Sequence, residues 1–240
     1  MSAGHRRLED PNRRADHTRS TFIMTASTRF LTCVTLLLAG VCHVRAGGGS
    51  DFFVGPNGVT VMCPEAEIGS TGTIDGEEYT KRTREQLGEL VEADRNDVEI
   101  RLTCTSAITD MSSLFDSAVL FDQDIGRWDT GNVVNFQSMF RSAGDFNQDI
   151  GRWDTSKATN MGQMFDSAST FNQNISNWNT AEVTDMFAMF QSAGAFNQDL
   201  SGWCVSKVGG LFGTPPKPLN FDANADAWDL AQPNFANPPC

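Results

Sequence analysis

The stretch FNQDI at residues 146–150 decides the fold, because the chain repeats it. Near-copies read FDQDI at 121–125, FNQNI at 171–175 and FNQDL at 196–200, and each copy begins 25 residues after the previous one. Other columns keep the same spacing, and the clearest consists of Trp128, Trp153, Trp178 and Trp203. Four copies in one register, without an insertion, predict an array of similar coils that bury each other's apolar faces.

Each copy divides into two halves with different apolar patterns. In residues 159–168, Met161, Met164, Phe165 and Ala168 lie at i, i+3, i+4 and i+7, which predicts a short helix. Residues 171–180 are short and carry Phe, Ile and Trp, which favours an extended segment or one short strand. We therefore predict an α/β repeat solenoid of the leucine-rich-repeat type. It would contain about four coils of a short helix and a short strand, a parallel sheet, and disulfide-linked caps at both ends.

A polar column lies between the apolar ones and consists of Asp122, Asn147, Asn172 and Asn197. We expect these short side chains to bond backbone groups that a curved coil leaves unpaired. The alternative is a ladder of calcium ligands, formed together with Asp124, Asp149, Asn174 and Asp199. Because the third copy has no carboxylate in either column and the Gly-rich spacing of calcium β-rolls is missing, we expect no bound metal and no cofactor.

The first 46 residues differ from the rest of the chain. Arg29 precedes an apolar run over 30–41, and the small residue Ala46 precedes GGGS. A basic flank, an apolar run of about a dozen residues and a small residue before the cut are typical of a secretory signal peptide. We predict cleavage after Ala46, with Met24 as an alternative start. The other interpretation, a membrane anchor, is disfavoured because the run is shorter than the roughly 20 residues that span a bilayer. No stable membrane insertion after cleavage is expected.

The chain after the predicted cut is acidic and contains no histidine. Residues 1–46 hold seven Lys and Arg and three Asp and Glu, so their removal changes the net charge from −12 to about −16. Such a surface repels phosphate backbones, which argues against nucleic acid as a partner. All three histidines, His5, His17 and His43, precede the cut, which excludes a His-based triad, general base or zinc site.

Four cysteines follow the cut: Cys63, Cys104, Cys204 and Cys240. An even number in a secreted chain suggests disulfides, with three possible pairings. Cys104 and Cys204 stand four coils apart, about 19 Å at about 4.8 Å per coil, whereas a disulfide needs Cα atoms within about 7 Å. Unless a tail runs back along the array, the pairs are therefore Cys63–Cys104 and Cys204–Cys240, one in each cap.

The flanking segments are expected to close the ends of the array. We predict a flexible linker over 47–59, an N-terminal cap over 60–107, the four coils over 108–207 and an irregular, Pro-rich C-terminal cap over 208–240. Within the N-terminal cap the apolar patterns predict a strand at 59–63, a helix within 80–95 and a strand at 100–104.

The copies TNMGQMFDSASTFNQNISNWNT at 159–180 and TDMFAMFQSAGAFNQDLSGWCV at 184–205 resemble the repeat of BspA-like leucine-rich-repeat surface proteins. That repeat runs V-T-D-M-x-x-M-F-x-x-A-x-x-F-N-Q-D-I-S-x-W-D, and the resemblance extends from Ile108 to about Val208. The departures are mild: Leu114 and Asp122 in the first copy, and Val134-Asn135-Phe136 in the second. The resemblance implies a secreted or surface-displayed solenoid that binds proteins or glycans in adhesion, without catalytic residues.

Exposed positions that vary along the array are the candidate ligand contacts, and we expect them in three neighbouring columns of the strand face. The first column contributes Arg127, Arg152 and Asn177, the second Gln123, Gln148, Gln173 and Gln198, and the third Asp124, Asp149 and Asp199. In the third column, Asn174-Ile175-Ser176 is also a glycosylation sequon for a secreted chain. The alternative is a solvated face on which the two arginines pair with nearby acids.

These observations predict a non-enzymatic protein that is secreted or displayed at the cell surface and binds an extracellular protein or glycan. The alternative is a structural component of a cell wall or matrix, without a discrete ligand. A calcium-binding repeat or a hydrolase with paired carboxylates is less expected, because the acids are spread evenly along the copies and no break in the repeat collects them.

Overall fold

The computed structural model describes residues 51–209, 217–236 and 240. Contacts divide the chain into two units, 1–47 and 48–240, and every described residue belongs to the second. The predicted signal peptide over 1–46 therefore lies outside the described residues. Among the described residues, no helix is long and apolar enough to cross a bilayer.

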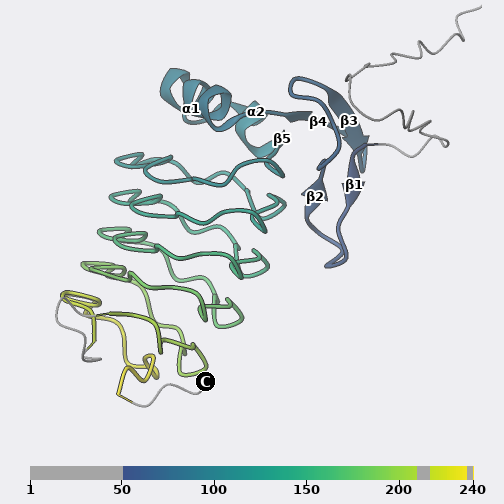
Figure 1. Cartoon of the computed structure of the whole chain (residues 1–240). Coiled ribbons are helices and arrows are strands. Elements are labelled where there is room, and N and C mark those ends of the chain that lie inside the picture. The colour runs from purple at the N-terminus through teal and green to yellow at the C-terminus, as the bar shows by residue number, and fades with distance from the viewer. Residues whose placement is uncertain (1–50, 210–216, 237–239) are drawn as a thin grey trace, which may run out of the picture. The chain divides into compact units, whose positions relative to one another are not determined.

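Short strands and two helices precede the coils (Figure 1). Strands β1 (Phe53–Val54) and β2 (Val61–Met62) form an antiparallel pair, so β1 falls inside the segment predicted as a linker. Strands β3 (Thr71–Ile74) and β4 (Glu77–Lys81) form a second antiparallel pair, and β5 (Thr103–Cys104) adds to β4 in parallel.

Helix α1 (Arg84–Ala93) lies within the predicted range and begins with a capping box. The Thr83 side chain accepts from the Gln86 amide, and the Gln86 side chain accepts in return from the Thr83 amide. Leu87 and Val91 are the buried residues of this helix, as the period of the sequence predicts.

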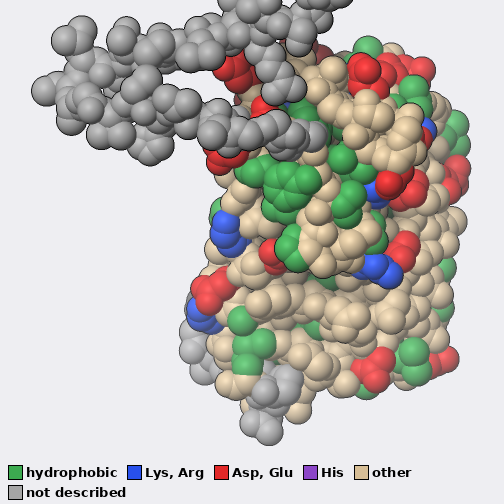
Figure 2. Space-filling model, turned by 90° about the vertical axis from the view of Figure 1, so that its right-hand side faces the viewer, with side chains coloured by type: hydrophobic (Ala, Val, Ile, Leu, Met, Phe, Trp, Pro, Cys, Tyr) green, Lys and Arg blue, Asp and Glu red, His purple; other side chains and the backbone are tan. Residues whose placement is uncertain are grey.

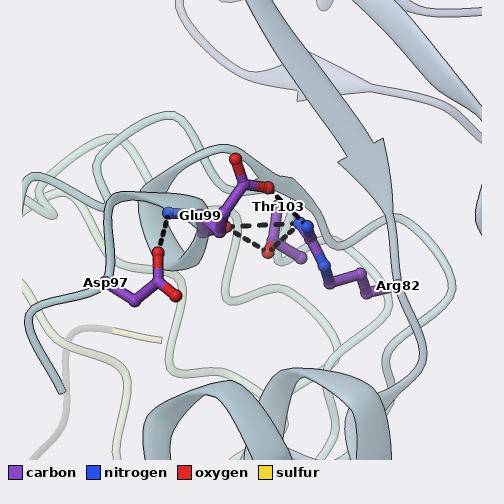
Figure 3. A network of polar contacts seen from close by, with 4 residues as sticks. All are labelled: Arg82, Asp97, Glu99 and Thr103. Atoms are coloured by element: carbon purple, nitrogen blue, oxygen red, sulfur yellow. Dashed lines mark hydrogen bonds and ion pairs between the residues drawn. The ribbon is translucent and has the colours of Figure 1, made fainter. Parts of the chain in front are cut away.

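The strand predicted over 100–104 is wrong at its start, because helix α2 (Val98–Arg101) includes Ile100 and Arg101. The Asp97 carboxylate caps this helix by accepting from the Glu99 amide, at 2.9 Å. Figure 3 shows how Arg82 holds α2 in place: it reaches the Glu99 carboxylate at 2.5 Å and the Thr103 hydroxyl at 3.0 Å. These contacts tie α2 to β5 and to the residue that follows β4.

The predicted fold class, an α/β leucine-rich-repeat-like solenoid with a parallel sheet, is wrong. Residues 105–209, all of which the structure describes, form no helix and no strand. The sheets that do form are small and precede the coils. In residues 105–209 the β-type pairs between neighbouring coils are isolated parallel bridges, which join Asp110, Asn135, Asn160 and Asp185 in series. Figure 1 shows these coils lying one above another as successive turns of one continuous chain, without ribbon or arrow.

Tandem turns replace the predicted helix, and their backbone bonds alternate in direction. The N–H groups of Met111, Ser113, Phe115 and Ser117 donate to carbonyls of the next coil, at 2.7–2.9 Å. The intervening N–H groups of Leu114, Asp116 and Ala118 donate to the residue three places earlier in their own coil. The Ser112 N–H donates to Asp110 Oδ1, so all eight backbone donors from Met111 to Ala118 are satisfied without a helix, half of them by the neighbouring coil.

The spacing that predicted a helix also suits these turns. Met161, Met164, Phe165 and Ala168 are all buried, yet Gln163 and Ser167 between them have φ of 56° and 59°. A residue whose backbone lies in the left-handed region interrupts a helix, and here such a residue recurs every four positions. The apolar side chains between these residues point inward. The same four-residue rhythm therefore serves a chain of turns.

Stacked aromatic rings fill the interior. Phe115, Phe140, Phe165 and Phe190 are fully buried, and the centroids of successive rings in this column lie 5.6 Å apart. Within a coil each of them also stacks on a second Phe, as Phe165 does on Phe171 at 4.0 Å. The Trp column stacks with spacings of 6.3–6.5 Å. Continuous burial of this kind is the dominant stabilising term of the array.

Residues 217–235 lie against the fourth coil and pair with it as a further coil would. Ala188, Phe190 and Ser192 donate backbone bonds to the carbonyls of Leu219, Phe221 and Ala223, at 2.7–3.1 Å. Asn220 and Asn224 take positive φ, as the residues at the same places in earlier coils do. These residues belong to the segment predicted as an irregular C-terminal cap.

Both predicted disulfides are present. Cys63 bonds to Cys104, and Cys204 bonds to Cys240, with Cα atoms 6.3 and 5.5 Å apart. The first joins the segment after β2 to β5, and the second joins the fourth coil to the end of the described chain.

Candidate functional site

The Asn and Gln columns hold the coils together. As predicted, the short side chains pair with backbone: the Asn147 amide donates to Asp122 Oδ1 at 2.9 Å, and the Asn172 amide donates to Asn147 Oδ1 at 2.9 Å. The side-chain nitrogens of Gln148, Gln173 and Gln198 donate to the carbonyl of the residue 26 places earlier, at 2.7–3.0 Å. Gln123 has no preceding coil and donates instead to the carbonyls of Arg95 and Asp97. The four glutamines therefore use their donors within the fold.

The third column is exposed but locally engaged. Asp124, Asp149 and Asp199 each accept with Oδ1 from the amide two residues later, at 2.9–3.0 Å. Bonds from the Ser201 hydroxyl and backbone lower the pKa of Asp199 below its ordinary value. Each carboxylate keeps a second oxygen for solvent or a ligand. Among the described residues, no three His, Cys, Asp or Glu side chains lie close enough together to hold a metal ion.

Asn174 occupies the same column and is exposed, as a glycosylation acceptor must be. Its Oδ1 accepts from the Ser176 amide at 3.0 Å, which places the sequon in a turn. The prediction that Asn174 carries a glycan stays a prediction.

Arg127 joins the N-terminal strands to the first coil. Its Nε donates to the Val59 carbonyl at 3.1 Å, and its guanidinium meets the Asp75 carboxylate at 2.7 Å. The guanidinium carbon also lies 5.7 Å from the centre of the Tyr79 ring. The Arg127 carbonyl accepts from the Val61 amide, so both ends of this residue are engaged. Its contacts are those of a packing residue.

Arg152 and Asn177 occupy the Arg127 position one and two coils later, and both are exposed. The structure assigns neither side chain a partner within the described part of the chain. Of the predicted contacts, these two remain the most available to a ligand. Arg127 and Arg152 stand in one column of the sequence, but the structure gives them different surroundings.

A groove that the sequence did not indicate lies between α1 and the first coil. It has a volume of about 500 Å³ and is open to solvent. Ile68, Ala107 and Ile108 supply apolar walls, and Arg84, Glu85 and Asp110 supply charge. The Arg84 guanidinium donates to the Ser112 carbonyl at 2.9 Å, which fixes this side chain across the groove. Only the fold brings residues 68, 84 and 107 together, because they lie in three different segments.

Acidic side chains lie at several separate places on the face drawn in Figure 2, with basic side chains between them. Two ion pairs join neighbouring coils: Asp116 meets Arg141 at 2.5 Å, and Glu182 meets Lys207 at 2.7 Å. No shift of pKa among the described groups singles out an acid or base for catalysis, because each one has an ordinary local cause.

A family model described as "Mycoplasma protein of unknown function, DUF285" matches the chain twice, over residues 90–203 and 149–237. Together the two matches span more than half of the chain and include residues 217–235, which pair with the fourth coil. Neither the curated proteins nor the solved structures contain a match.

Proposed function

The chain belongs to the DUF285 family, whose function is unknown, and we propose that it acts as BspA-like surface proteins do. It is then a non-enzymatic protein, secreted or displayed at the cell surface, that recognises another macromolecule through the surface of its coils. One observation carries this proposal: the interior repeats from coil to coil, whereas exposed positions in the same frame change.

The contrast is clearest between two columns of the same coils. The fully buried Phe column is invariant over four coils, whereas the exposed column changes from Arg152 to Asn177 to Gly202. A core that stacks identical rings needs repetition, but a surface that only meets water does not need a particular side chain. Variation on a rigid frame is how repeat proteins present a binding surface.

The two disulfides support an extracellular location. Bonds of this kind persist in oxidising compartments and are rare in the cytosol. The acidic composition of the chain, with a sequence pI of about 4.6, makes a nucleic-acid partner unfavourable.

The test is a binding screen of the full chain against immobilised extracellular-matrix proteins and cell-surface glycans, read by surface plasmon resonance. We expect at least one partner whose affinity falls about tenfold in Arg152→Ala. Arg127 is left unchanged, because its loss would disturb the N-terminal strands. Lys207→Ala is the matched control, since Lys207 is an exposed cation that already pairs with Glu182.

A folded, monodisperse protein that binds no member of the screen would contradict the proposal. That result would favour a structural component of a wall or matrix. If a partner binds Arg152→Ala and wild type equally, the chain has a recognition function, but the Arg152 column is not the binding site.

A further inference from the structure

At two successive junctions between coils, one carbonyl oxygen accepts two consecutive N–H groups of the next coil. The Val134 oxygen accepts from the amides of Thr159 and Asn160, at 2.9 and 3.3 Å. The Thr159 oxygen in turn accepts from Thr184 and Asp185, at 2.8 and 3.2 Å. The pairing is the same at both junctions. Two consecutive N–H groups in this position therefore bind one carbonyl oxygen of an extended chain.

The equivalent donors of the first coil are the amides of Thr109 and Asp110, and no coil precedes them. The structure assigns these two N–H groups no acceptor among the described residues, and both residues are exposed. They lie in the wall of the groove between α1 and the first coil. In later coils the preceding coil supplies the acceptor for such donors, whereas in the first coil the two donors lie in the wall of an open groove.

The groove has the size and chemistry to receive a chain there. Its volume of about 500 Å³ lies within the range of ligand pockets, roughly 300–1,000 Å³. Ile68, which is 45% exposed, and Ala107 offer apolar walls to a side chain. The carboxylates of Glu85 and Asp110 outnumber the single Arg84 guanidinium, which favours a basic side chain beside the apolar one.

We propose that this groove binds an extended, basic peptide segment of a partner protein, which continues the row of coils. One carbonyl of that segment accepts from the amides of Thr109 and Asp110, as the Val134 oxygen accepts from the coil after it. The inference rests on the proposed function, and it narrows the partner from protein or glycan to protein. It extends to a partner chain the mode of recognition in which an extended segment pairs with open backbone groups.

The test uses a random heptapeptide library selected on the immobilised full chain, and the most enriched peptide is then synthesised. We expect this peptide to carry Lys or Arg next to an apolar residue. On binding, amide hydrogen exchange at Thr109 and Asp110 should slow about tenfold or more, whereas the already paired Val134 amide should not change.

Two Trp substitutions separate the groove from the rest of the surface. Ala107→Trp fills the groove and should weaken the peptide about tenfold or more. Ala93→Trp, at the exposed end of α1 and outside the groove, is the matched control and should bind as wild type does. Thr109→Pro removes one donor without enlarging a side chain in the groove wall and should also weaken binding.

Enrichment of no peptide, or a peptide that binds Ala107→Trp as tightly as wild type, would overturn the inference. These results leave the proposed function separately testable. A protein partner that binds Ala107→Trp normally but loses affinity in Arg152→Ala would keep the recognition role and place it on the coil surface. Failure of both screens would remove the proposed function as well.

Discussion

At the scale of single residues, the Trp column shows that the first coil lacks a hydrogen bond which the later coils make with the coil before them. The Nε1 groups of Trp153, Trp178 and Trp203 donate to the carbonyl 28 residues earlier, at 3.0–3.2 Å. For Trp128 the corresponding carbonyl would be that of Ile100, which helix α2 has turned to accept from Leu102. The buried Trp128 Nε1 consequently has no partner among the described residues.

This difference predicts that two chemically identical substitutions have different costs. Trp→Phe removes the same atoms at both buried positions, but only Trp153 loses a hydrogen bond, whereas Trp128 loses an unsatisfied donor. We expect Trp153→Phe to be more destabilising than Trp128→Phe by about 1–3 kcal/mol. Urea unfolding of both variants measures this directly, and equal losses would show that a water or a shifted carbonyl serves Trp128.

The pair of Asp116 and Arg141 predicts a small dependence of stability on pH. The hydrogen bond from Arg141, aided by its charge, lowers the pKa of Asp116 below the ordinary value near 3.9. The lowered carboxylate pKa stabilises the fold above about pH 4, and this contribution disappears as pH falls through the folded pKa. Because both side chains are partly exposed, the contribution should be only about 0–1 kcal/mol.

Carbon-detected NMR titration of the Asp116 carboxyl checks the pairing. In Arg141→Met the pKa of Asp116 should rise toward its ordinary value, because the first cause of the shift has gone. Arg152→Met is the control, since Arg152 has no assigned contact with Asp116. A pKa that does not move in Arg141→Met would mean that the neighbouring Ser117 determines it.

At the scale of elements, the N-terminal strands depend on one arginine of the first coil. Arg127 holds the Val59 carbonyl and Asp75, which belong to the two separate β-hairpins. In Arg127→Ala we expect faster amide exchange in β1 and β2 and in the turn at Asp75, with little change in residues 159–190. Arg152→Ala is the matched control and should leave these rates unchanged. Uniformly faster exchange would instead mean that the hairpins and the coils unfold together.

The sequence predicted the register of the coils but not the structure within a coil. The 25-residue columns fixed which side chains stack, and the Asn147 column was expected to pair with backbone, which the structure confirms. The helix over 159–168 was wrong because burial at i, i+3, i+4 and i+7 also fits tandem turns. Ser113 and Gln163 take positive φ without a glycine to reveal it.

The groove and the role of Arg127 were not predictable in this way. Both arise where segments far apart in sequence meet, as when Arg127 reaches Asp75. Alignment of the repeats makes Arg127 and Arg152 equivalent, because it contains no information about the N-terminal strands that precede the first coil. Prediction from the repeat therefore fails at the end of an array. The residue is the same as in the other coils, but the segment packed against it is not a coil.

At the scale of the whole molecule, the two disulfides close the two ends of the array and should act independently. Cys63–Cys104 and Cys204–Cys240 span 41 and 36 residues, for which chain entropy gives about 4 kcal/mol each. In a stack each coil contacts only its neighbours, so the loss of one bond loosens the nearest coils first.

We therefore expect the Cys→Ser double variants of the two bonds to differ in where exchange rises. Loss of Cys204–Cys240 should speed amide exchange in residues 217–235, which rest on the fourth coil through backbone bonds and through edge-on contacts of Phe221 and Trp228 with Phe190. Loss of Cys63–Cys104 should speed exchange in β1 and β2 instead. Each variant serves as the control for the other, measured by hydrogen exchange with mass spectrometry. Faster exchange of the same residues in both variants would show that the coils unfold as one cooperative unit, because only then does the loss of a disulfide at one end change exchange at the other end.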